Sequence, residues 1–155
     1  MLIAQQTNTT TPSNSEVDQS LSTASEHLRV LAIDDNDEFR ILLKELLEPY
    51  GFEVVPEANP VRALEKFARQ KDKFHLVLLD YNMPQLDGSK TFECLKKLSP
   101  DVRVIIVSGV EELRLRPILA RHPIDGYIRK PFRVQEALQI IRRVMTKNPT
   151  VRVVN

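Results

Sequence analysis

The chain has 155 residues, and its 22 basic side chains nearly balance its 21 acidic ones. This length corresponds to one domain with one hydrophobic core, and no apolar run is long enough to span a bilayer. The single cysteine, Cys94, excludes an internal disulfide and a multi-cysteine metal site. Its place in a helical apolar pattern predicts a buried, unreactive thiol. The first residues lack the segments of a signal peptide, so we expect a cytoplasmic protein.

Charge is distributed unevenly along the chain. Residues 1–100 contain 11 basic and 16 acidic side chains, whereas residues 101–155 contain 11 and 5. This pattern predicts two differently charged surfaces and does not by itself indicate nucleic acid binding.

The two ends of the chain differ in composition from the part between them. Residues 1–27 are rich in Ser, Thr, Asn and Gln and contain no Lys or Arg, which predicts a disordered polar tail. Regular apolar patterns fill residues 28–147, which we assign to one folded domain. Residues 148–155 are too few for an output domain and are expected to form a C-terminal tail.

Five short apolar runs predict strands, because strands buried on both faces of a parallel sheet are nearly continuous in apolar residues. They cover residues 30–33, 52–55, 74–79, 102–107 and 126–129. The third run ends abruptly in Asp80. The Met83-Pro84 and Asp87-Gly88 pairs that follow predict a loop.

Apolar residues at helical spacing predict a helix after each strand. The first is closed by Gly51 and is expected to bury Phe39, Leu42, Leu43, Leu46 and Tyr50. The second opens with Asn59 as its cap and Pro60 in its first turn, and should bury Val61, Leu64 and Phe67.

The remaining three helices are predicted in the second half of the chain. The third covers roughly residues 89–98. The fourth would cover residues 111–121, but Pro117 costs about 3 kcal/mol inside a helix, so it should be short, kinked or late in starting. The last is expected to bury Val134, Ala137, Leu138, Ile141 and Met145. Strands alternating with helices are typical of an α/β fold, a doubly wound parallel sheet covered on both faces.

Polar residues suited to chemistry follow four of the predicted strands. Asp34 and Asp35 follow the first, Asp80 the third, Ser108 the fourth and Lys130 the fifth. Right-handed crossovers bring these strand ends to one edge of the sheet. Three converging carboxylates repel one another, and a divalent cation with oxygen ligands, Mg²⁺, relieves that repulsion. A lysine and a hydroxyl at the same edge suit an incoming phosphoryl group.

From about residue 28 to residue 146 the chain resembles a receiver domain of two-component response regulators, of the single-domain chemotaxis type. The segments that carry the resemblance are L-A-I-D-D-N-D, L-V-L-L-D-Y-N-M-P-Q-L-D-G, I-I-V-S-G and G-Y-I-R-K-P-F. The resemblance implies a flavodoxin-like sheet of five parallel strands in the order 2-1-3-4-5, with five helices.

The resemblance also implies a role for each site residue. Asp80 would be the phosphoacceptor, with Asp35 binding Mg²⁺ directly, Asp34 assisting and the backbone carbonyl of Asn82 completing the protein's share of the metal shell. Ser108 would hydrogen-bond the phosphoryl group and Lys130 would pair with it. Pro131 would form a cis peptide with Lys130, and Tyr127 would be the aromatic switch residue that moves inward on activation.

Other classes of phosphate-handling site lack their characteristic residues in this sequence. The Gly-rich motifs of nucleotide-binding folds do not occur, and a phosphatase of the haloacid dehalogenase type needs an acid where this chain has Asn82. Two alternatives stay open: a degenerate receiver that acts as a phosphorylation-independent binding module, and the receiver part of a larger regulator whose output domain is absent.

We therefore expect a single-domain regulator in a phosphorelay. It would take a phosphoryl group from a histidine kinase or phosphotransfer protein, catalyse only its own phosphorylation and dephosphorylation, and signal through protein contacts. Ile41, outside the apolar stripe, is the candidate for docking the donor, and Phe39 is assigned to the core. The output face would be basic and could dock an acidic partner or a second copy of the chain: Arg114, Arg116, Arg121, Arg129, Arg133, Arg142 and Arg143. Neither DNA nor a membrane is an expected partner.

Overall fold

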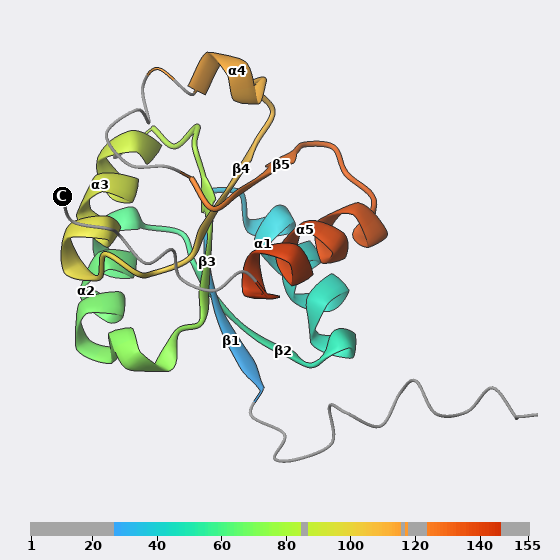
Figure 1. Ribbon diagram of the computed structural model, residues 1–155, viewed down its shortest axis with the longest axis horizontal. Coiled ribbons are helices and arrows are strands. Elements are labelled where there is room, and N and C mark those ends of the chain that lie inside the picture. Colours follow the sequence, from blue (N-terminus) through green and yellow to red (C-terminus); the bar gives the residue numbers. More distant parts are fainter. Residues whose placement is uncertain (1–26, 85–86, 116, 118–123, 147–155) are drawn as a thin grey trace, which may run out of the picture.

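The computed structural model describes residues 27–84, 87–115, 117 and 124–146. Their strands form a parallel sheet in the order β2-β1-β3-β4-β5 (Figure 1). The strands are β1 Leu28–Ile33, β2 Phe52–Glu57, β3 Leu76–Asp80, β4 Val104–Ser108 and β5 Gly126–Arg129. The five expected strands and their order are confirmed, and every expected boundary lies within two residues of the observed one.

Helices connect the strands and cover both faces of the sheet. They are α1 Asp37–Leu47, α2 Pro60–Gln70, α3 Gly88–Leu98, α4 Glu112–Leu115 and α5 Val134–Thr146, with 3₁₀ turns at Glu48–Tyr50 and Lys71–Lys73. Figure 1 shows α1 and α5 on one face, α2 and α3 on the other, and α4 beyond the carboxyl end of β4. This arrangement is the predicted flavodoxin-like fold.

Each face of the sheet has its own apolar core. Successive residues of a strand point to opposite faces, so β1 sends Val30 and Ala32 into the core beneath α1 and α5. It sends Leu31 and Ile33 into the core beneath α2 and α3. Burial on both faces is the reason why the strands read as continuous apolar runs.

The expected inward stripe of α1 is partly wrong. Leu47, which is not among the residues expected to be buried, is 1% exposed, whereas Leu42 is 44% exposed and Tyr50 also lies at the surface. The face of α1 that meets the sheet repeats every four residues, through Phe39, Leu43 and Leu47, and the α-helix ends before Tyr50 is reached. Ile41 lies outside this face as predicted, at 59% exposure.

Two other burial predictions are corrected by the structure. Val61 is 51% exposed, because α2 turns Ala63 and Phe67 toward the sheet and Val61 lies in its first turn on another side. Cys94 is a half-buried free thiol rather than a buried one. It precedes the buried Leu95, and one residue turns an α-helix by about 100°.

Side-chain caps set the first residues of α1 and α3, the helices that follow β1 and β3. The Asn36 side chain accepts a hydrogen bond from the Phe39 N–H and so caps α1 three residues after β1 ends. The Asp87 side chain likewise accepts from the Ser89 N–H at the start of α3. Asn59 caps α2 as predicted, by accepting from two backbone N–H groups.

Several expectations concern residues outside the described ranges. Within those ranges α4 is short, Glu112–Leu115, but most of the expected span beyond it, residues 116 and 118–121, is not described. The predicted tails lie almost wholly in residues 1–26 and 147–155, which are not described either. No helix among the described residues has the length and apolar character needed to cross a membrane.

Candidate functional site

The site lies where the chain reverses its direction of travel through the sheet. β1 and β3 are neighbours although β2 comes between them in sequence. In open α/β sheets such a switch point leaves a crevice outside the carboxyl ends of the two strands. Asp34 and Asp35 follow β1 at this crevice, and Asp80 is the last residue of β3.

Three carboxylates meet in the crevice. One oxygen from each of Asp34, Asp35 and Asp80 lies within 4.8 Å of the other two. Asp34 and Asp80 are buried, at 1% and 6% exposure, whereas Asp35 is exposed. Carboxylate oxygens at this spacing, with one exposed member, fit a hard divalent cation such as Mg²⁺ that retains part of its water shell.

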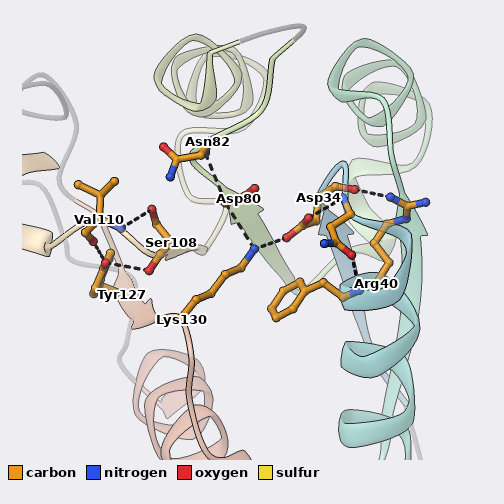
Figure 2. Close-up of polar contacts among 10 residues, drawn as sticks. Asp34, Arg40, Asp80, Asn82, Ser108, Val110, Tyr127 and Lys130 are labelled. Carbon is orange, nitrogen blue, oxygen red and sulfur yellow. Dashed lines mark hydrogen bonds and ion pairs between the residues drawn. The ribbon is translucent and has the colours of Figure 1, made fainter.

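Asp34 is held on several sides by other parts of the chain. Its Oδ1 accepts the Asn36 N–H at 2.9 Å, and its Oδ2 accepts from the Lys130 Nζ at 2.6 Å. Its backbone carbonyl accepts from the Arg40 guanidinium at 2.6 Å (Figure 2). The turn that carries Asp34 and Asp35 is therefore tied both to α1 and to the segment after β5.

Asp80 carries a perturbed carboxyl group. Burial raises its pKa, and the negative charges of Asp34 and Asp35 act in the same direction. The Lys130 ammonium and the Asn82 N–H, which donates to Oδ1 at 3.3 Å, act in the opposite direction without cancelling the rise. Ionised Asp80 is thus electrostatically costly in this crevice, and a bound cation would relieve that cost.

Lys130 faces the acids from the segment after β5. Its Nζ lies 2.6 Å from Asp34 Oδ2 and 3.6 Å from Asp80 Oδ1, so the ammonium is closer to Asp34 than to Asp80 (Figure 2). Its backbone N–H donates to the Ser108 carbonyl at 2.9 Å, which extends the β4–β5 ladder by one bond. The Lys130–Pro131 peptide is cis, as expected.

Ser108 and Tyr127 are joined through the loop after β4. The fully buried Ser108 accepts the Val110 N–H on its Oγ at 3.1 Å. The Tyr127 hydroxyl hydrogen-bonds the carbonyls of Ser108, at 3.1 Å, and of Val110 (Figure 2). Burial raises the pKa of Tyr127, so its hydroxyl stays a donor at neutral pH.

Most of the sequence-predicted site residues come together at this edge. The three acids and Lys130 are in direct contact or close to it, and Ser108 lies one position beyond Val107, the register partner of Asp80. Asn82 is placed beside Asp80 through its N–H.

Sequence reasoning missed two neighbours of the site. Arg40 clamps the Asp34 carbonyl and also pairs with Asp37. Phe39, assigned to the core, is only half-buried and lies with its ring under the Lys130 ammonium, 3.9 Å from Nζ to the ring centroid. Both residues lie in the first turn of α1, shortly after the acidic pair. That position could have indicated that Arg40 lies near Asp34. Nothing in the local sequence indicates the contact of Phe39 with Lys130.

The sheet order and the acidic crevice at its switch point define a flavodoxin-like α/β domain of the receiver class. The chain belongs to the response regulator receiver domain family, whose sequence profile matches residues 30–142. It is a receiver domain of the kind found in CheY-like response regulators.

Relatives of the chain differ in length, so the chain matches a small part of some and nearly all of others. It is 33% identical over 121 residues to the two-component response regulator ARR10 of Arabidopsis thaliana, covering 78% of this chain and 22% of that protein. It is 30% identical over 118 residues to the chemotaxis protein CheY of Bacillus subtilis, covering 76% of this chain and 97% of that protein. The chain therefore spans about a fifth of the plant regulator and nearly all of the bacterial one.

Solved structures share the fold. A CheY-like receiver domain from Methanospirillum hungatei has a TM-score of 0.70 at 29% identity, covering 76% of this chain and 93% of that one. TrrA of Thermotoga maritima, solved in complex with Mg²⁺-BeF, has a TM-score of 0.68 at 28% identity, with 76% and 98% covered.

Proposed function

We propose that the chain accepts a phosphoryl group on Asp80 from a phosphohistidine of a sensor histidine kinase or phosphotransfer protein, and that this changes its protein contacts. The observation that carries the proposal is the Asp80 carboxylate at the end of β3, buried beside two further acids and 3.6 Å from the Lys130 ammonium. In the transfer, an Asp80 oxygen forms a bond to phosphorus as the bond from phosphorus to the donor imidazole nitrogen breaks.

The donor set of the crevice fits Mg²⁺. Asp34, Asp35 and Asp80 would supply carboxylate oxygens, and Asn82 its backbone carbonyl. Mg²⁺ bound there would neutralise charge on these carboxylates and on the phosphoryl oxygens.

The chain's own residues would then hold the transferred group. Lys130, now paired with Asp34 at 2.6 Å, would shift toward a phosphoryl oxygen on Asp80. The Ser108 hydroxyl accepts a hydrogen bond from Val110, which leaves its own proton available to donate to the phosphoryl group.

This rearrangement would reach Tyr127 through the loop after β4. Turning Ser108 toward the phosphoryl group strains its hydrogen bond with Val110, whose carbonyl also binds the Tyr127 hydroxyl. Phosphorylation would therefore favour a second arrangement of this loop and of Tyr127, in which Tyr127 turns inward.

Two surfaces are candidates for the protein contacts. The donor would meet the exposed Ile41 on α1, beside the acidic turn. The output face would be the exposed basic surface of α4, β5 and α5, where a groove of about 470 Å³ opens beside Arg129. This groove is lined by Tyr127, Ile128, Arg129, Pro131, Phe132, Glu136, Gln139 and Ile140. Of the seven arginines assigned to the basic face, Arg116 and Arg121 lie outside the described residues.

Intact-mass measurement tests the phosphoacceptor. With Mg²⁺ and a small acyl phosphate, the wild-type chain should gain one phosphoryl group, and Asp80→Asn or EDTA should abolish the gain. Asp87→Asn is the matched control, since asparagine also caps helices and Asp87 caps α3. An unlabelled wild-type chain would favour the degenerate binding module, and equal labelling of Asp80→Asn would place the acceptor elsewhere.

A further inference from the structure

The Lys130 ammonium has an aromatic neighbour besides its two carboxylates. Its Nζ lies 2.6 Å from Asp34 Oδ2, 3.6 Å from Asp80 Oδ1 and 3.9 Å from the centroid of the Phe39 ring. The face of an aromatic ring is negative and attracts a cation at this distance. The ammonium is therefore held by two acids and a ring, which come from the turn after β1, the end of β3 and the first turn of α1.

The Phe39 ring is itself braced. The Phe132 ring meets it at a centroid distance of 5.9 Å and an interplanar angle of 88°, the edge-to-face geometry that aromatic pairs prefer. Phe132 follows Lys130 by two residues, so one segment supplies both the lysine and the brace for the ring beneath it. Both rings are half-buried against the core beneath α1 and α5.

The ring matters because the Lys130 side chain could instead turn out of the crevice into water. Its side chain is 23% exposed, and lysine carries a flexible stem with a strongly hydrated head that gains from turning into water. Asp34 and Asp80 approach the ammonium with carboxylate oxygens, and Phe39 approaches it with its ring face. A neutral aliphatic side chain at position 39 would fill the space beneath it without attracting it.

We propose that Phe39 is a positioning residue for the reaction: its ring face keeps the Lys130 ammonium inside the acidic crevice, within reach of a phosphoryl group arriving on Asp80. This inference rests on the proposed phosphoryl transfer for its kinetic consequence. The ring–ammonium contact itself belongs to the metal-free protein and is measurable without any transfer.

The contact is measured first, by NMR of the lysine side chains in EDTA. Protons above the face of an aromatic ring resonate upfield, so the ε-methylene protons of Lys130 should be shifted upfield in the wild type. Phe39→Leu should remove the shift, and Phe39→Tyr, which keeps the ring, should retain it. A Lys130 resonance that is not shifted in the wild type would overturn the proposal.

Kinetics measure the consequence, as the second-order rate constant for labelling by a small acyl phosphate in Mg²⁺. Phe39→Leu should be slower by about three- to tenfold, the range expected for losing a partly desolvated cation–π contact. Phe39→Tyr should label near the wild-type rate. Replacing Phe39 by 3,4,5-trifluorophenylalanine, which nearly keeps the shape but weakens the negative ring face, should slow labelling to an intermediate rate.

A matched control separates this role from packing. Phe74 stacks on Phe67 and carries the Arg29 guanidinium over its ring at 5.1 Å, just before β3 and away from the crevice. Phe74→Leu makes the same change in another aromatic–cation pair, so it should lower the unfolding midpoint while labelling near the wild-type rate.

The outcomes are distinguishable. If the wild type is labelled and Phe39→Leu is labelled equally fast, the positioning role is overturned and the proposed function is left intact. The same follows if Phe39→Tyr is labelled as slowly as Phe39→Leu. A wild type that is not labelled overturns the proposed function and the kinetic role together, and the NMR shift then decides whether the ring holds the lysine. Labelling that is slowed about three- to tenfold, together with loss of the upfield shift, in Phe39→Leu but not in Phe39→Tyr or Phe74→Leu, supports the inference.

Discussion

At the scale of single residues, the site depends on a carboxylate placed where its charge is unfavourable. Asp80 is buried next to two other acids, and its pKa is raised, first by burial and then by their charges. Lys130 offsets part of this cost but lies closer to Asp34. We infer that a crevice which disfavours the free carboxylate favours whatever neutralises it, whether a metal ion or a phosphoryl group accompanied by a metal ion.

The raised pKa of Asp80 predicts how stability depends on pH. A raised pKa means that the native state binds a proton more tightly than the unfolded state, so stability falls as pH rises through the native pKa. In EDTA near neutral pH, Asp80→Asn should therefore be more stable than the wild type, and the difference should shrink as pH is lowered through the carboxylate range.

Denaturant unfolding across this pH range measures the difference. Asp101→Asn, which changes an exposed carboxylate outside the crevice, is the control and should follow the wild type at each pH. A wild type more stable than Asp80→Asn at neutral pH in EDTA would show that Lys130 outweighs burial and the neighbouring acids.

The residues that end strands could be predicted from sequence, and the residues that hold them could not. Asp34, Asp35, Asp80, Ser108 and Lys130 were predictable because each follows an apolar run whose end is visible locally. The contact of Phe39 with Lys130 joins positions 91 residues apart, and it depends on how far α1 is rotated against the sheet. Apolar periodicity does not determine that rotation to within one residue.

At the scale of elements, close packing of the α3 start fixes the loop that follows Asp80. A Cβ built at Gly88 would lie 2.6 Å from the Tyr81 Cα and 2.7 Å from its carbonyl oxygen. The Gly88 N–H also donates to that carbonyl at 3.3 Å. Only a residue without a side chain lets α3 begin this near the end of β3.

Gly88→Ala should therefore disturb both the fold and the site. The added methyl group meets backbone atoms that cannot rotate away, and overpacking of this kind costs about 1–3 kcal/mol. We expect a lower free energy of unfolding by denaturant, and slower labelling, because the Asp80–Tyr81 backbone must shift. Gly109→Ala is the control for stability, since nothing lies within 4 Å of its Cβ position. Equal stability of the two variants would contradict this account of α3.

Apolar patterns in the sequence predicted the strands but not which face of α1 is buried. The strands β3 and β4 could be placed because each is buried along its whole length and so reads as a continuous apolar run that ends in a polar residue. The burial of Leu47 and the exposure of Leu42 could not, because α1 has apolar residues around more of its circumference than the sheet covers. The excess apolar residues, Ile41 and Leu42, remain at the surface beside the acidic turn.

At the scale of the whole molecule, the exposed part of α1 is the surface that we propose for contact with a phosphodonor protein. Ile41→Ala should slow transfer from the cognate phosphohistidine protein while leaving labelling by a small acyl phosphate unchanged, because Ile41 is 59% exposed and lies outside the crevice. Val61→Ala, an exposed apolar residue on α2 across the sheet, is the matched control and should leave both rates unchanged. An Ile41→Ala protein with both rates reduced would mean that the site itself was disturbed.

Borohydride trapping tests most directly whether Asp80 forms the acyl phosphate. Borohydride reduces an aspartyl phosphate to homoserine. Trypsin then releases two separate fragments: residues 74–90 contain Asp80 and Asp87, and residues 30–40 contain Asp34 and Asp35. After labelling in Mg²⁺, fragment masses should place homoserine at position 80, and none should form in EDTA. Homoserine at position 34, 35 or 87, or no homoserine in a chain that gained phosphate, would contradict the assignment of Asp80 as the phosphoacceptor.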